Sequence, residues 1–160
     1  MGVIDDVGAV SGFAAVQDLV LRGLGDLSGP IGFLGARPGM QLAELRAWLG
    51  EPTVQSDDTL EYEVPLDHPE EGPRQHHTLR LVMNADASGR VGMINVVVTY
   101  FGTGELAPAW NAVTKAIQDH VVAGLGKPAS KRSSGSTWMR GDEQLWMLAK
   151  NGDLQMSFAV

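Results

Sequence analysis

The feature that most constrains the fold is a helix-ending motif that occurs twice in the 160-residue chain. Leu49-Gly50-Glu51-Pro52 returns as Leu125-Gly126-Lys127-Pro128, a spacing of 126 − 50 = 76 positions. In each copy the glycine can adopt the left-handed conformation that ends a helix, and the proline two residues later prevents the helix from continuing. Strand-like segments follow both copies. The sequence therefore predicts two tandem units, each made of a helix followed by a sheet.

The helix of each unit is predicted from apolar spacing. Leu42, Leu45 and Leu49 recur at i, i+3 and i+7, which places them on one face of a helix. In the second unit, Pro108 suits the first position of a helix. A longer apolar stripe follows it and is expected to lie across the sheet: Trp110, Val113, Ile117 and Val121.

An additional helix is expected near the N-terminus, over residues 11–22, with Ser11 as its N-cap. Residues 23–39 follow it and hold six glycines. A phosphate-binding loop at this place needs a preceding strand and a following Gly-Lys-Ser/Thr, and the sequence has neither. We therefore expect a loop that returns three apolar side chains to the core: Ile31, Phe33 and Leu34.

Strands are predicted where apolar and polar residues alternate. They cover residues 59–64, 77–84 and 91–100 in the first unit and residues 136–140, 144–150 and 153–159 in the second. The strand over 91–100 is apolar on both faces, which is typical of a central strand covered by a helix behind and by something else in front. Residues 65–76 are expected to form a polar loop, and Asn151-Gly152 predicts a type I′ hairpin turn.

The predicted fold class is α+β, with two tandem units of a helix and a three-stranded antiparallel sheet that form one sheet packed by helices. Residues 1–160 are expected to form a single domain. Within it, residues 1–100 are the first unit with its N-terminal helix, and residues 101–160 are the second unit. A chain of this length can bury one real core, roughly 70% of its unfolded surface.

Composition and charge exclude several classes of function. The chain has no cysteine, so a disulfide scaffold, a zinc–cysteine site and a thiol nucleophile are ruled out. No apolar run reaches the roughly 18 residues of a membrane span, and the first ten residues carry two aspartates rather than a basic secretory signal. We therefore expect a soluble, cytoplasmic protein that does not act on a membrane.

The net charge of −7 is unevenly distributed along the chain. Residues 1–100 carry 14 acidic and 6 basic residues, whereas residues 101–160 carry 5 acidic and 6 basic residues. An acidic first part repels nucleic acid and attracts basic partners. Ordinary solubility charge is the alternative explanation.

The side chains that could carry chemistry do not form a recognisable catalytic or metal site. His68, His76 and His77 flank an acidic loop, but adjacent histidines on a strand point to opposite faces. Glu61 and Glu63 share one face of a strand and could act as a general acid and base. The serines of residues 128–136 are expected in a flexible loop, which lacks the strained turn of a nucleophile elbow. We therefore expect no metal, no cofactor and no enzymatic activity.

The tryptophans indicate a candidate binding surface. Trp146 has the opposite parity to both of its neighbours in the strand, so one face of that strand is expected to meet solvent. Trp138 lies on the preceding strand beside Met139 and Arg140, a combination typical of binding hot spots. The alternative is that all four tryptophans are core residues.

The turn and cap signals together resemble a known fold. Gly39-Met40 precedes the short helix, Leu49-Gly50-Glu51-Pro52 ends it and Leu60-Glu61-Tyr62 opens a strand, as in the small outer-membrane assembly lipoprotein (SmpA/OmlA) fold. Two such units in tandem resemble the β-lactamase inhibitor protein fold, whose sheet presents a concave face to its target. Similar motifs occur in immunity proteins that neutralise bacterial toxins. The resemblance covers residues 36–160, and the chain departs from it in lacking the inhibitor's cysteines and export signal and the lipoprotein's anchor.

Our first hypothesis is a non-enzymatic protein of the inhibitor or immunity class, a monomer or homodimer that masks a basic toxin or enzyme. The residues expected to bind this partner are Asp57, Asp58, Glu61, Glu63, Asp67, Glu70, Glu71, Trp138, Arg140 and Trp146. The alternative is a cytoplasmic secretion chaperone that grips an effector segment as a homodimer, with the helix over 108–123 and the strand over 91–100 as its interface. A third hypothesis is an enzyme that uses Glu61, Glu63 and the loop histidines.

Overall fold

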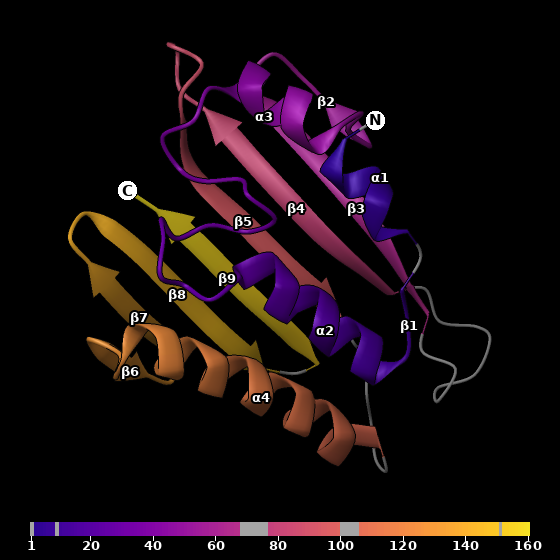
Figure 1. Cartoon of the computed structure of the whole chain (residues 1–160), viewed down its shortest axis with the longest axis vertical. Helices are drawn as coiled ribbons and strands as arrows, with labels where there is room; N and C mark the ends of the chain where they lie inside the picture. The colour runs from indigo at the N-terminus through magenta and orange to yellow at the C-terminus, as the bar shows by residue number, and fades with distance from the viewer. Residues whose placement is uncertain (1, 9, 68–76, 100–105, 151) are drawn as a thin grey trace.

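The computed structural model describes residues 2–8, 10–67, 77–99, 106–150 and 152–160, and it has the predicted α+β architecture (Figure 1). The helices are α1 (Val3–Val7), α2 (Phe13–Leu24), α3 (Leu42–Leu49) and α4 (Ala107–Leu125). The strands are β1 (Val10–Ser11), β2 (Val54–Gln55), β3 (Thr59–Asp67), β4 (His77–Ala85), β5 (Val91–Thr99), β6 (Ser130–Arg132), β7 (Gly135–Arg140), β8 (Glu143–Lys150) and β9 (Asp153–Ala159).

The strands of the described residues form one nine-stranded sheet. Its order is β1-β3-β4-β5-β9-β8-β7-β6, with β2 beside β3. All pairings are antiparallel except that of β1 with β3, which is parallel. The two predicted units therefore share one sheet, and β5 and β9 join them at its centre. The prediction of a central third strand is confirmed.

The helices lie on one face of this sheet, and the core fills the space between the two layers (Figure 1). α2 crosses the middle of the sheet beside α4, while α3 packs on β3 and β4. The predicted stripe of α4 is buried in this core: Trp110, Val113, Ile117 and Val121. The stripe is therefore covered by its own chain, and the residues that α4 leaves at the surface lie on its other side.

The glycine-rich segment between α2 and α3 returns to the core as predicted. Ile31 and Phe33 are buried, and Leu34 is half-buried with a positive φ of 53°. Gly23 allows the Phe33 ring to approach α2, because a Cβ at residue 23 would lie 2.8 Å from Phe33 Cδ2. The segment is thus a packed connection and not an open phosphate loop.

The 76-residue spacing extends beyond the helix-ending motif. Gly50 and Gly126 both follow their helices with positive φ, 107° and 85°, and each donates its N–H to the carbonyl four residues earlier. An aromatic side chain then returns to each glycine. The Tyr62 hydroxyl donates to the Gly50 carbonyl at 2.7 Å, and Trp138 Nε1 donates to the Gly126 carbonyl at 2.9 Å. Each unit therefore satisfies the exposed end of its helix in the same way.

The short strands follow the same relation. Val54 of β2 pairs with Glu61, and Ser130 of β6 pairs with Thr137, so both partners are again separated by 76 positions (130 − 54 = 76). Each unit is therefore a helix, a short strand and three longer strands. β1, β2, β6 and α1 were not predicted, because elements of two to five residues are too short to show a periodic pattern.

The two units meet around an approximate two-fold axis perpendicular to the sheet. At the junction of β5 and β9, Ile94 pairs with Phe158 and Val96 pairs with Met156. The axis passes beside Asn95, which faces Ser157 across the junction and accepts a hydrogen bond from its hydroxyl at 2.6 Å. The sheet is thus built from two like halves joined by their last strands.

The predictions for residues 11–22 and 65–76 need correction. Ser11 does not cap α2: it lies in β1, its hydroxyl donates to Asp67 at 3.4 Å, and Gly12 with a φ of 86° precedes the helix. β3 continues through Pro65 to Asp67 where a loop was expected. Both differences have one cause, because β1 pairs with the end of β3, a contact between residues far apart in the sequence.

The predicted hairpin between β8 and β9 is present. Lys150 pairs with Asp153, which leaves a two-residue connection, and Gly152 has the positive φ of 86° that a type I′ turn requires. Asn151, the other residue of the predicted turn, lies outside the described residues.

Candidate binding face

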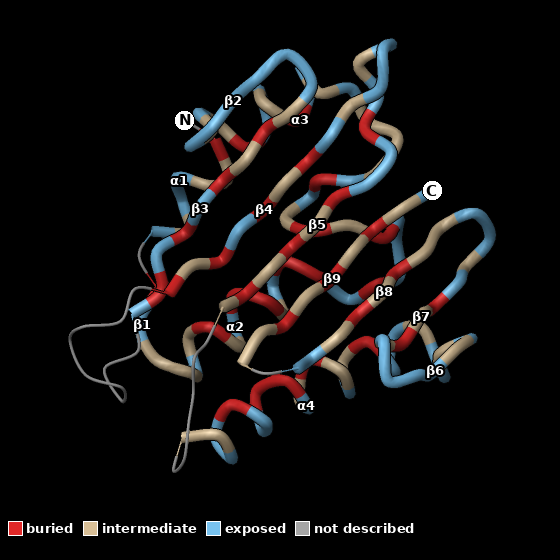
Figure 2. The backbone as a smooth tube through the Cα atoms, turned by 180° about the vertical axis from the view of Figure 1, so that it is seen from behind, coloured by how far each residue is buried: buried red, intermediate tan, exposed pale blue. Residues whose placement is uncertain are grey.

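No described helix covers the other face of the sheet, which we call the open face (Figure 2). Within the described residues, β5 is therefore covered by helices on one face, as predicted, and what covers its other face stays a prediction. Met93 is 46% exposed on the open face, and Val97 is half-buried there. An apolar strand has been left facing solvent at the centre of the sheet.

Strand pairing aligns the open-face side chains in rows. The Trp146 row runs from β3 to β7 through Glu61, Val82, Asn95, Ser157, Trp146 and Thr137. The Glu63 row beside it runs through Glu63, Arg80, Val97, Gln155 and Leu148. On the other side of the Trp146 row lie Met93 and Met139, and Met139 is 54% exposed. The centre of the open face is therefore a mixture of apolar and uncharged polar groups.

Trp146 is held flat on this face by the turn between β6 and β7. Its Nε1 donates to the Ser134 carbonyl at 3.0 Å, and its ring lies over Gly135. A Cβ at residue 135 would lie 2.8 Å from Trp146 Cε2 and 2.8 Å from the Met147 carbonyl oxygen, and Gly135 has a φ of 121°. Only glycine fits there without displacing the ring. A fixed aromatic ring loses little entropy on binding, which favours its use as an anchor.

The acidic end of the open face lies on β3. Arg80 of β4 donates to the Glu61 carboxylate through Nε at 2.7 Å, and its Nε lies 3.9 Å from Glu63. Two carboxylates therefore share one guanidinium, which leaves this end with a net negative charge. The Glu63 side chain is 42% exposed and that of Glu61 is 16% exposed, so Glu63 is the more accessible of the two.

The other predicted acidic residues are arranged in different ways. Asp58 accepts hydrogen bonds from the Ser56 and Thr59 hydroxyls at 3.0 and 3.1 Å and so shapes the turn before β3. Asp57 lines a hollow of about 490 Å³ between α3 and this turn. Asp67 is exposed at the end of β3. Glu70 and Glu71 lie outside the described residues.

Two of the predicted partner-binding residues are structural. Trp138 is 1% exposed in the core, because its side of β7 faces the helices, and it therefore cannot contact a partner. Arg140 donates to the carbonyls of Leu27 and Gly29 and lies 3.4 Å from Glu143. Its guanidinium holds the glycine-rich segment in place. Trp146 is the tryptophan of the second unit that reaches the open face.

Sequence reasoning missed the cationic end of the open face. Arg132 pairs with Gly135 and Lys150 pairs with Asp153, so both side chains lie on the same side as Trp146. Both are exposed, and neither forms an ion pair within the described part of the chain. The excess of bases after residue 100 indicated this charge, but only strand pairing could show on which face of the sheet it lies.

Trp48, which the alternative interpretation of the tryptophans placed in the core, is 49% exposed on the helix side. Its Nε1 donates to the Leu34 carbonyl at 2.8 Å, and its ring lies over Gly35, which has a φ of 82°. The arrangement is the same as that of Trp146 over Gly135.

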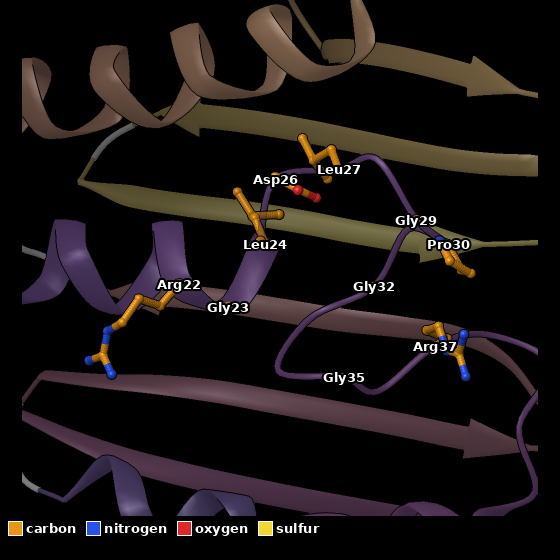
Figure 3. Close-up of a pocket in the computed structure, with 11 residues that line it drawn as sticks. Arg22, Gly23, Leu24, Asp26, Leu27, Gly29, Pro30, Gly32, Gly35 and Arg37 are labelled. Carbon is orange, nitrogen blue, oxygen red and sulfur yellow. The ribbon is translucent and has the colours of Figure 1, made fainter.

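Gly35 also lines a hollow of about 410 Å³ in the glycine-rich segment, with Arg22 at one end and Arg37 at the other (Figure 3). The side chains of this hollow diverge, so it lacks the convergent polar groups of a small-molecule site.

The metal-binding side chains of the described residues are dispersed. None of them belongs to a group of three or more metal-binding side chains, and His68 and His76 lie outside the described residues. Burial raises the pKa of Tyr62 to about 12 and raises the pKa of Asp153, whereas hydrogen bonds from Ser88 lower the pKa of Asp86. Each shift has a local structural cause. Among the helices described, none has the length and apolarity needed to cross a membrane.

Comparisons with known proteins add no relative to this picture. The chain matches no protein-family model, and it matches neither a curated protein nor a solved structure.

Proposed function

We propose that the protein is a non-enzymatic binding protein that covers a surface of a protein partner with its open face, in the manner of an inhibitor or immunity protein. The observation that carries this proposal is Trp146, which the β6–β7 turn fixes flat on a sheet face without a covering helix in the described chain. Exposed Met93 and Met139 lie in the neighbouring row. Aromatic and methionine side chains are enriched in protein interfaces.

The size of the open face fits such a role. The six strands from β3 to β7 lie about 4.8 Å apart and run for about 25 Å, so the face measures about 24 Å by 25 Å, or roughly 600 Å² before side-chain relief is counted. A standard interface buries about 800 Å² on each partner. One folded partner can therefore cover most of the open face.

The charge supports a basic partner, such as a toxin or an enzyme. Glu61 and Glu63 share a single arginine at the β3 end, exposed Asp67 follows them, and the whole chain carries a net charge of −7. Charges of this kind speed encounter and make it sensitive to salt, while a buried aromatic anchor slows dissociation.

The test starts from immobilised protein exposed to a lysate of the native cell, with elution in salt steps and mass spectrometry. A captured protein is then purified and titrated against three forms of the chain: the wild type, Trp146→Ala and the control Trp48→Ala, which removes an exposed tryptophan from the helix side. We expect Trp146→Ala to weaken binding at least about 30-fold, as for a hot spot, and Trp48→Ala to leave it unchanged. Equal binding by all three forms would contradict the proposal.

A further inference from the structure

The two ends of the open face carry opposite charge. Glu61, Glu63 and Asp67 lie on β3, and Arg80 compensates only part of their charge. Beyond Trp146 at the other end, Arg132 of β6 is exposed and forms no ion pair within the described residues. Lys150 is also exposed, but it lies on β8 and pairs in register with Asp153, a carboxylate on the same face, so the positive charge of this end comes from Arg132. A partner that satisfies both ends must itself be basic at one end and acidic at the other.

We infer that in the free protein this partner is a second copy of the chain, so that the open faces of two copies pack against each other with β3 of each over the β6–β7 end of the other. The inference rests on the proposed function in one respect, namely that the open face is a docking surface. Beyond the proposed function, the inference states that a binding partner displaces the second copy. Such a partner presents a basic group to β3 and an acidic group to the β6–β7 end, as the second copy does.

The charges select one of two possible arrangements. Two sheets packed face to face are related by a two-fold axis in the plane between them. If the axis runs across the strands, β3 lies over β3, and like charges meet. If the axis runs along the strands above the β5–β9 junction, the strand order of the second copy is reversed relative to the first. Glu63 of one copy then lies over β7 of the other, next to Arg132 on the adjoining strand β6 of that copy. Because such a contact is isologous, each favourable pairing forms twice.

The same axis brings apolar groups together at the centre. Val82 lies on β4 and Trp146 on β8, both in the Trp146 row and both on the second strand from the junction. Each Trp146 ring therefore packs on Val82 of the other copy. The two faces together bury roughly 1,200 Å², the lower end of the range for specific interfaces. We expect a dimer with a dissociation constant in the micromolar range, which a tighter partner can displace.

The test is sedimentation velocity on the full chain over a concentration series, with charge-reversal variants. Glu63→Lys and Arg132→Glu each place like charges together at both contacts, so each variant is expected to dissociate at least tenfold more readily than the wild type. An equimolar mixture of the two variants restores opposite charges at both contacts and is expected to form heterodimers. The double variant Glu63→Lys/Arg132→Glu is expected to regain the wild-type dimer.

The matched control is Lys131→Glu, which makes the same charge change on the neighbouring residue of β6. Lys131 pairs with buried Ser136, so it lies on the helix side and its reversal is expected to leave the dimer intact. Circular dichroism melting curves establish that each variant is folded.

The inference is overturned if the wild type stays monomeric at concentrations up to about 500 µM, far above a micromolar dissociation constant. It is also overturned if the Arg132→Glu and Lys131→Glu dimers dissociate equally, or if Glu63→Lys and Arg132→Glu fail to associate when mixed. If the wild type is a monomer and its partner binding still depends on Trp146, the inference is contradicted and the proposed function is supported. If the mixed charge variants form a dimer but partner binding does not change in Trp146→Ala, the inference is supported and the proposed function is contradicted.

Discussion

Replacing Gly135 with alanine tests whether the β6–β7 turn holds Trp146 in place. The φ of 121° at this residue disfavours any side chain, and the new Cβ would lie 2.8 Å from the Met147 carbonyl oxygen, which belongs to the backbone of the paired strand and cannot move aside. The Trp146 ring must also leave the turn, and its hydrogen bond to the Ser134 carbonyl at 3.0 Å is then lost.

The expected cost combines about 1–2 kcal/mol for the unfavourable backbone conformation with about 1 kcal/mol for the lost hydrogen bond. A total of about 2–3 kcal/mol lowers the melting temperature of a chain of this size by roughly 4–12 °C. Gly141→Ala is the matched control, because Gly141 has a positive φ of 60° but no atom within 4 Å of its Cβ position. It is expected to cost only about 1 kcal/mol, roughly 2–4 °C.

Two measurements check this prediction. Calorimetry gives the melting temperatures, and NMR gives the exchange rate of the Trp146 indole N–H, assigned from its absence in Trp146→Phe. We expect faster exchange in Gly135→Ala and no change in Gly141→Ala. If the two alanine variants are equally stable and the indole N–H stays protected in both, the turn does not hold the ring and our account of the open face is wrong.

Three further predictions concern stability. Tyr62→Phe removes the hydrogen bond to the Gly50 carbonyl and is expected to cost about 1 kcal/mol at neutral pH. Burial raises the pKa of Tyr62 from 10.0 to about 12, so the folded wild type loses stability as the pH rises through this range, whereas Tyr62→Phe does not. In urea unfolding the advantage of the wild type should therefore shrink above pH 10.0 and change sign before about pH 12. Burial raises the pKa of Asp153, so its charge is unfavourable in the folded state at pH 7, and Asp153→Asn is expected to raise the melting temperature there. At acid pH the wild-type carboxyl is protonated and the difference in melting temperature between variant and wild type should narrow; a difference that widens on acidification would contradict this. Arg140→Ala removes the hydrogen bonds to the carbonyls of Leu27 and Gly29 and is expected to lower the free energy of unfolding by about 1–3 kcal/mol. Amide hydrogen exchange around Leu27 and Gly29 should be faster in Arg140→Ala than in Arg132→Ala, the control at an exposed site.

The elements of this fold were predictable where the signal is local. The stops after α3 and α4 depend on Gly50 and Gly126, whose positive φ angles follow from lacking a Cβ. The alternation in β3, β4 and β9 sorted buried from exposed positions correctly, because successive residues of a strand point to opposite faces. The β1–β3 pairing escaped prediction because it joins residues far apart in the sequence.

The candidate site was harder to predict for the same reason. Alternation separated Trp146 from its neighbours but could not show which face of β7 and β8 meets the helices. That choice buried Trp138 and left Trp146 on the open face. Arg140 resembled an interface residue in the sequence, because its acceptors at Leu27 and Gly29 come from a segment that precedes it by more than 100 positions.

The amino-acid sequence by itself determined the two tandem units, the ends of their main helices and the alternation of their strands, because each depends on interactions within a few residues. The tertiary structure alone decided that the units join through β5 and β9, that one sheet face stays free of helices in the described chain, and that this face is acidic at β3 and cationic at Arg132 of β6. These features depend on strand order and on which side of the sheet the helices cover. Both are set by packing between distant segments, and no local pattern of residues encodes them.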